Sequence, residues 1–491
     1  MTQMLPARGA SRMLIAKENT EAGSKVSGFL KWWHSPWGPG PLLGVALPLM
    51  ISAGFMSITL FTDRTLLYWD SEASAAAAMS GGTLYWTALC FPTGLLGYVA
   101  TFVAQYVGAR QFQRIGSVYR HGIVIAWGCV PFVLLMLLLA DKVFIWSGHQ
   151  PRTVELEAGY LRILLLGGIG VLFYSVQSGV LTGEGRTRTV LAIDAVATLV
   201  NLLLNAVLIF GFGPIPALGL WGAAIATTCS FWIKVPIAHW LLFRSQVYVE
   251  ERGFQRKLGT AWEPQLISRI IRFGSPAGLQ MLAESFCFTI ILLQVGRLGE
   301  LEMAATTLAL GLNILAFVPL IGLGIGVGVL VGQRLTEGRV DLAKRAVTCA
   351  LCLSVCYTSG FALMLGLAPR TMLSLYALGA SVERFAEIEP LILPLLGIIA
   401  VYCVLDGLQI VFVGAIKGAG DTWFVLLATL LISVGVVVAG LLMENAGYGH
   451  LNLWWYVIAL WIALMGIAFG SRYASGAWQS KRVIEDAGEP N

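Results

Sequence analysis

The sequence predicts an all-α membrane protein with twelve transmembrane helices, arranged as two six-helix lobes that an internal parallel repeat relates. Three observations support this fold class. Hydrophobic residues make up 57% of the 491-residue chain and charged residues only 12%, whereas soluble domains carry roughly 25% charged residues. Apolar runs of about 20 residues, enough to cross a bilayer as a helix, recur along nearly the whole chain. Features of the first half also return in the second half at a constant offset.

The chain begins with a polar, basic segment that no signal-peptide core follows, so we expect a cytoplasmic tail there. Two long apolar regions then flank a polar, charged segment, which we interpret as the linker between the lobes. The predicted segments are an N-terminal tail (1–35), an N-lobe (36–243), a cytoplasmic linker (244–266), a C-lobe (267–475) and a cytoplasmic C-terminal tail (476–491).

Hydrophobicity along the chain predicts six spans in each lobe, and short polar turns separate them. Helices are expected because every backbone group must be hydrogen-bonded within a lipid bilayer. The predicted spans are 41–69, 78–108, 118–140, 156–182, 188–211, 217–243, 267–295, 303–333, 344–367, 386–416, 422–443 and 452–474.

Basic residues are distributed unevenly between the two sides of this topology. With the N-terminus inside, the tails and inner loops hold 24 of the 32 Lys and Arg residues, and the outer loops and span ends hold seven. Lys234 alone lies within a span. Cytoplasmic loops carry an excess of Lys and Arg. We therefore expect both termini to be cytoplasmic and the protein to lie in the inner or plasma membrane.

The two halves repeat each other. Gln105 and Gln333 are 228 positions apart and stand in similar surroundings, Val-Ala-Gln-Tyr-Val and Val-Gly-Gln-Arg-Leu. Pro48 and Pro276 have the same spacing. Later the offset becomes 235, where Gly-Glu-Gly-Arg-Thr at 183–187 matches Gly-Ala-Gly-Asp-Thr at 418–422. An even number of spans in each half makes the repeats parallel, and transporters commonly bind substrate between such halves.

Several function classes lack their sequence signature. No phosphate-binding loop, catalytic triad or metal cluster is evident. The eight cysteines all fall in apolar spans, so we interpret them as packing residues. We expect no enzymatic activity, no cofactor and no resident metal, and the membrane orientation explains the net charge of +5 without a nucleic-acid partner. We expect this chain to act as a monomer, with the lipid bilayer as its partner.

The predicted C-lobe contains two carboxylates inside apolar spans, Glu284 and Asp406. Gln280 lies one turn before Glu284, and Tyr402 one turn before Asp406, with Gln409 as a further polar neighbour. An ionisable residue at such depth indicates a functional site. Two nearby carboxylates in low dielectric cannot both stay charged alone, so the pair would take up a proton or a monovalent cation. The alternative is a structural hydrogen-bonded pair.

The predicted N-lobe contains a second polar group. Asp63 lies on the first span, Thr227 on the sixth, and Asn201 and Asn205 share a face of the fifth. Asp194, seven residues before Asn201, lies on that same face.

Two basic residues leave this second group open to other interpretations. Asp63 could be an interfacial acid paired with Arg64, and Asp194 could lie near the inner mouth. Lys234 has no assigned role, although pairing with a carboxylate is possible.

Several motifs in order along residues 41–475 resemble the multidrug and toxic compound extrusion transporters. The motifs are Gly-Ser-Pro-Ala-Gly-Leu-Gln at 274–280 with Glu284, Val-Gly-Gln-Arg-Leu at 331–335, Tyr-Leu-Arg-Ile at 160–163, Asn-Ala-Val-Leu-Ile-Phe-Gly at 205–211, Trp-Gly-Ala-Ala-Ile-Ala-Thr at 221–227, Asp-Gly-Leu-Gln at 406–409 and Lys-Gly-Ala-Gly-Asp-Thr at 417–422.

The resemblance implies a V-shaped pair of bundles that exchanges bulky, often cationic organic compounds for H⁺ or Na⁺. It also implies cation binding by Glu284, Tyr402 and Asp406 in the C-lobe. In the N-lobe it implies a proton or sodium site of the first-span Asp with polar residues of the fifth and sixth spans. The segment Asp63-Arg64-Thr65 departs from the family pattern of Asp-Thr followed by a glycine-containing stretch.

Two other functions remain as alternatives. A flippase for lipid-linked oligosaccharides belongs to the same superfamily, but a pyrophosphate substrate would favour several basic residues in the cavity. The spans offer only Lys234 and Arg162 against four acids. A membrane sensor without transport activity would not explain the paired acids or the duplication.

Overall fold

The computed structural model describes residues 38–146, 151–244, 251–254, 262–377 and 382–485, together with Trp33 and Ser35. The predicted N-terminal tail and most of the predicted linker lie outside these residues. The α-helices are α2 (Gly40–Asp70), α3 (Glu72–Gly97), α4 (Val99–Gly108), α5 (Arg114–Trp146), α6 (Pro151–Gly183), α7 (Thr187–Phe210), α8 (Leu220–Arg244), α9 (Pro264–Leu298), α10 (Glu300–Thr336), α11 (Val340–Leu367), α12 (Pro369–Ala377), α13 (Val382–Ala419), α14 (Thr422–Met443) and α15 (Leu451–Ala474).

Twelve helical stretches of the described chain are long and apolar enough to cross a membrane, which confirms the predicted spans. Two details differ from the prediction. The second span consists of α3 and α4, which meet at Tyr98. The short helix α12 follows the ninth span and was not predicted, because a nine-residue helix gives little periodic signal.

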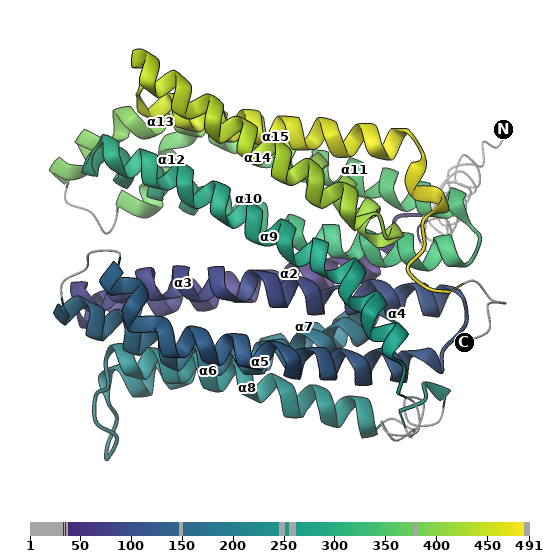
Figure 1. The fold of residues 1–491 in the computed structure, drawn as a ribbon. Helices are drawn as coiled ribbons and strands as arrows, with labels where there is room; N and C mark the ends of the chain where they lie inside the picture. Colours follow the sequence, from purple (N-terminus) through teal and green to yellow (C-terminus); the bar gives the residue numbers. More distant parts are fainter. Residues whose placement is uncertain are drawn as a thin grey trace, which may run out of the picture.

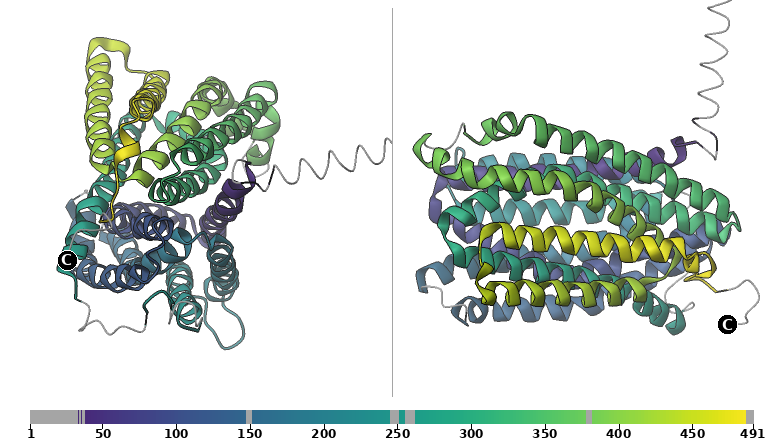
Figure 2. Two further views of the ribbon diagram at one scale, coloured as in Figure 1. Left: turned by 90° about the vertical axis from the view of Figure 1, so that its right-hand side faces the viewer. Right: turned by 90° about the horizontal axis from the view of Figure 1, so that it is seen from above.

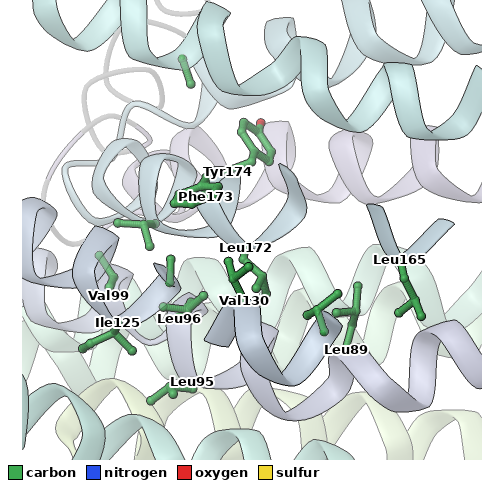
Figure 3. Packing of buried hydrophobic residues seen from close by; sticks show 14 of the residues in the cluster. Leu89, Leu95, Leu96, Val99, Ile125, Val130, Leu165, Leu172, Phe173 and Tyr174 are labelled. Atoms are coloured by element: carbon green, nitrogen blue, oxygen red, sulfur yellow. The ribbon is translucent and has the colours of Figure 1, made fainter. Parts of the chain in front are cut away.

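The helices form two layers, with α2 to α8 in the N-lobe and α9 to α15 in the C-lobe (Figure 1). The N-lobe core lies between α3, α5 and α6, where Leu89, Val130 and Leu172 are buried (Figure 3). The first turns of α9 extend this core, since Leu266 and Ile270 are buried in it. The second lobe has its own core around Trp454 and Trp455.

Glycines allow the two lobes to approach each other closely at two helix crossings. Gly322 on α10 packs on α2, where a Cβ atom would lie 2.4 Å from the backbone nitrogen of Met50. Gly94 on α3 packs on α9, where a Cβ atom would lie 2.6 Å from the Cα atom of Gly278. Side chains at these positions would force the lobes apart. Small residues at such interfaces are typical of membrane helix packing.

The same tight turn follows α6 and α13, as the repeat predicts. Gly185 and Gly420 both have positive φ, 78° and 109°, a backbone conformation that glycine adopts without strain. The last helical carbonyl groups beside these turns accept hydrogen bonds from the opposite lobe. Gln333 donates to the oxygen of Gly183 (2.8 Å), and Gln105 donates to the oxygen of Gly418 (3.0 Å).

The C-terminal segment after α15 packs against both lobes instead of forming a detached tail. It turns through a short 3₁₀ helix, Ala477–Ser480, and buries Trp478 completely. Glu485 forms ion pairs with Arg114 of α5 and Arg269 of α9. Figures 1 and 2 show this segment at the end of the bundle where α4 ends.

Candidate functional site

A cavity of about 310 Å³ lies in the N-lobe beside the lobe interface. Helices α2, α6, α7 and α8 supply most of its walls, and α10 of the opposite lobe contributes Gly322 and Ile325. The lining combines apolar and aromatic side chains, such as Phe55 and Phe231, with hydroxyl and charged side chains. Sites for small organic molecules typically combine an apolar lining with polar groups that fix the orientation of the ligand.

Asp63 lies on the cavity wall with only 5% of its surface exposed. One carboxylate oxygen accepts a hydrogen bond from the amide of Asn205, and the other accepts one from the hydroxyl of Thr227 (2.9 Å). Asn201 completes the group, because its amide donates to Thr227 (3.2 Å) and its oxygen accepts from Asn205 (3.0 Å). The structure therefore brings together four of the five predicted N-lobe residues.

The oxygen atom Oδ1 of Asn205 is buried and has no hydrogen-bond partner among the residues that the structure describes. A buried acceptor without a partner is unfavourable by about 1–3 kcal/mol. It lies on the side chain that also contacts the Asp63 carboxylate. Carboxylate, amide and hydroxyl oxygens thus gather at one point, and oxygen ligands are the ones that hard cations prefer. The cluster is chemically suited to a proton on Asp63 or to a small monovalent cation.

Arg64 does not neutralise Asp63 through a direct ion pair. Its side chain is exposed, and the hydrogen bonds of Asp63 go to Asn205 and Thr227. Between these two neighbours in sequence, the structure shows no salt bridge.

Asp194, the fifth predicted N-lobe residue, belongs to a separate polar group in the same cavity. Its carboxylate accepts hydrogen bonds from Ser52 and from the hydroxyl of Tyr174 (3.0 Å), and it pairs with the ammonium of Lys234 (2.9 Å). Asp194 thus shares a helical face with Asn201, as predicted, but its partners are these three residues and not the Asp63 group. Lys234 was not among the predicted site residues. Its position as the only basic residue within a span indicated that it could belong to a polar site.

The C-lobe residues come together less tightly. The amide of Gln280 donates to Glu284 (2.8 Å), as their spacing of one helical turn predicts. Asp406 is 7% exposed and interacts electrostatically with Glu284. No hydrogen bond in the described residues joins Tyr402 to either carboxylate, and its ring stacks on that of Trp455 instead, 6.5 Å between centroids.

Of two further residues of α13, Lys417 interacts with this group and Gln409 does not contact it through any hydrogen bond in the described part of the chain. Gln409, predicted as a supporting polar residue, faces α15 near Gly466. Lys417 interacts electrostatically with Glu284. The sequence indicated Lys417 only as part of the motif at 417–422.

Comparisons with known proteins support these structural observations. The family model described as MatE matches residues 48–207 and 276–441. A relative from Pseudomonas putida, described as the probable multidrug resistance protein NorM, is 27% identical over 453 residues, covering 91% of this chain and 96% of that protein.

Solved structures share the fold. One is described as the outward-facing conformation of a multidrug resistance MATE family transporter of the MOP superfamily, with TM-score 0.80, 20% identity, and 91% and 97% of the two chains covered. Another is a MOP superfamily transporter from Pyrococcus furiosus, whose description states that the reverse polarity of its binding pocket suggests a different function. It has TM-score 0.78 and 21% identity, and 92% and 98% of the two chains are covered.

Proposed function

This chain belongs to the MatE family, and we propose that it is a secondary active antiporter that exports bulky, often cationic organic compounds in exchange for H⁺ or Na⁺. The observation that carries the proposal is the placement of Asp63. Its buried carboxylate lines an apolar cavity and is held by Asn205 and Thr227.

Coupling follows from competition at this carboxylate. A buried carboxylate is strongly destabilised unless it is neutralised. A proton, a sodium ion or the cationic group of a substrate can each supply that neutralisation, so the binding of one reduces the gain from another. Thermodynamic linkage makes the effect reciprocal between the ion and the substrate. Exchange then requires no covalent chemistry.

Movement of the two lobes against each other would open the cavity to one side of the membrane and then to the other. The interlobe hydrogen bonds of Gln105 and Gln333 and the ion pairs of Glu485 lie at the end of the bundle where α4 and α13 end. If both termini are cytoplasmic, as we propose, this is the inner end, and closure there would leave the cavity accessible from the outer side. Import of the coupling ion and release of the substrate would occur from this state.

The charge of the cavity favours this function over the flipping of lipid-linked oligosaccharides. Two carboxylates and one ammonium group, those of Asp63, Asp194 and Lys234, line the cavity among the described residues. A lipid pyrophosphate would meet more acidic than basic groups there. A small organic cation would find a favourable partner in Asp63.

The proposal is tested with purified protein in liposomes that contain a fluorescent organic cation, tetramethylrhodamine methyl ester. A proton gradient and a sodium gradient are imposed separately. Dye movement against its own gradient, driven by one of the two ions and absent in protein-free liposomes, is the expected result. Dye movement that neither gradient changes would contradict the proposal.

A further inference from the structure

We propose that the segment after α15 is a strap, residues 477–485, which stabilises the closed state at the end of the bundle where α4 and α13 end. The strap is the yellow segment beyond α15 in Figures 1 and 2. One part of it is anchored in the C-lobe, and another part is docked on the N-lobe core. The docked part must leave the N-lobe before this end can open, so the strap regulates the movement of the lobes. This inference rests on the proposed function only in requiring that movement.

The anchor of the strap is Trp478. Its side chain is completely buried, in a cluster that α10, α11 and α13 of the C-lobe mainly supply. Its ring stacks on that of Tyr473 on α15, with 5.1 Å between the ring centroids, and its indole N–H donates to the carbonyl of Tyr473 (2.9 Å). Burial of a large aromatic side chain with a satisfied N–H group strongly stabilises this position. The anchor therefore moves with the C-lobe.

The dock of the strap consists of Val483, Ile484 and Glu485. Val483 and Ile484 are buried in the N-lobe core, and the backbone N–H of Val483 donates to Oε1 of Gln105 on α4 (2.8 Å). The carboxylate of Glu485 pairs with Arg114 of α5 (2.8 Å). Apolar burial and a buried hydrogen bond both stabilise the docked state, whereas a partly exposed ion pair contributes little. Docking on the N-lobe therefore depends mainly on Val483 and Ile484.

Val483 lies at the interface between the lobes. It packs against the glycine turn after α13, where a Cβ atom at Gly420 would lie 2.8 Å from Cγ1 of Val483. Four residues, 479–482, join Val483 to Trp478. Even when fully extended, the chain between these two residues spans at most about 18 Å. A large separation of the lobes would therefore pull Val483 away from the N-lobe, while Trp478 stays in the C-lobe.

The strap makes the two repeat-related glutamines unequal. Gln105 donates to the carbonyl of Gly418 and accepts from Val483, so it binds both the opposite lobe and the strap. Gln333 donates to the carbonyl of Gly183 and has no hydrogen bond to the strap in the described part of the chain. The repeat alone predicts equal effects of the two glutamines. An additional effect of Gln105 that disappears when the strap is released is therefore specific to the strap.

The test measures the opening of this end in the purified protein, by the distance between two spin labels. The labels are placed at the exposed positions Arg188 on α7 and Lys344 on α11, one in each lobe. Val483→Asp places a carboxylate where the docked side chain is completely buried, which is strongly unfavourable, so the dock should be released. The ratio of open to closed molecules should rise roughly tenfold or more, because the closed state loses apolar burial and a hydrogen bond.

Ser480→Asp is the matched control for the added charge. It introduces the same carboxylate at an exposed position of the strap, so the dock should remain in place and the distance distribution should stay unchanged. Both variants keep the anchor, Trp478, and both should elute as the folded protein does in size-exclusion chromatography.

The two glutamines provide a second comparison with the same labels. In the presence of the wild-type strap, Gln105→Ala should raise the ratio of open to closed molecules roughly two- to tenfold more than Gln333→Ala, the effect of one additional hydrogen bond. In the Val483→Asp protein, the two alanine changes should have similar effects, because the released strap no longer binds Gln105.

An unchanged distance distribution in Val483→Asp would overturn the inference. Equal opening in Val483→Asp and Ser480→Asp would also overturn it, since the added charge and not the release of the dock would be the cause. Equal effects of Gln105→Ala and Gln333→Ala with the wild-type strap would do the same. Greater opening in Val483→Asp alone, in a protein that transports no dye under either ion gradient, would uphold the strap and contradict the proposed antiport.

Discussion

Gln105 and Gln333 make equivalent contacts from opposite lobes. The side-chain amide of each crosses the lobe interface and donates to a carbonyl group beside a glycine turn, at Gly418 for Gln105 and at Gly183 for Gln333. The two glutamines and the two turns are related by the internal repeat. The duplication therefore builds a symmetric pair of interlobe hydrogen bonds, which holds this end of the molecule closed.

Replacing both glutamines by alanine should open this end. A hydrogen bond contributes about 0.5–1.5 kcal/mol, so the double change should shift the balance between closed and open states by about 1–3 kcal/mol, roughly 5- to 150-fold. Spin labels at the exposed positions Arg188 and Lys344 report the distance between the lobes at this end. In the double variant, the population with a longer distance between the two labels should grow. An unchanged distance distribution would show that the two hydrogen bonds do not hold this end closed.

The C-terminal segment should be released by the change Glu485→Gln. Its carboxylate pairs with Arg114 of α5 and Arg269 of α9, and these partly exposed pairs contribute only about 1 kcal/mol or less. Lys481 is exposed, but trypsin must also bind the backbone around the cleaved bond, which the docked segment holds in place. Release should therefore make cleavage after Lys481 several-fold faster, as measured by mass spectrometry. The exposed Glu300→Gln serves as the control. Equal cleavage rates in all three proteins would show that the ion pairs do not hold the segment.

Arg64→Gln should preserve most of the ion-driven efflux. Asp63 receives its hydrogen bonds from Asn205 and Thr227, and Arg64 is exposed. We expect a change of less than about twofold, because exposed charges contribute little. Efflux is measured in the liposome assay beside Asp63→Asn, which should abolish it. Loss of efflux in Arg64→Gln with correct folding would place Arg64 in the mechanism.

Glu284→Gln should fold and reach the membrane but lose coupling to the ion gradient. The change removes the charge that interacts with Asp406 and Lys417 and keeps a side chain that can hydrogen-bond to Gln280. Tyr402→Phe should have a smaller effect, since its ring packs on Trp455 and only one oxygen is lost. Wild-type efflux in Glu284→Gln, with an unchanged response to the gradient, would exclude Glu284 from coupling.

Local patterns predicted much of this structure. The lengths of the apolar runs located the spans, and helical spacing placed Asn201 and Asn205 on one face of α7. The family resemblance grouped that face with Asp63, which Asn205 contacts in the structure. Gln280 and Glu284 likewise meet across one turn of α9. Such predictions succeed because the residues concerned belong to one helix or to neighbouring helices.

The contacts between distant segments could not be predicted in this way. The partners of Asp194 on α7 come from α2, α6 and α8, and their meeting depends on how these helices cross. The burial of Trp478 and the bridging role of Glu485 depend on where the C-terminal segment returns. The repeat indicated that Gln105 and Gln333 are equivalent, but it could not show that each binds the opposite lobe.

The central claim, that one buried carboxylate links ion and substrate, is tested most directly by the ion dependence of substrate affinity. Binding of tetramethylrhodamine methyl ester is measured by fluorescence polarisation across a series of pH values and sodium concentrations, in the wild-type protein and in Asp63→Asn. The account predicts that raising the coupling ion weakens dye binding in the wild type and has no effect in Asp63→Asn. An equal ion dependence in both proteins would contradict it.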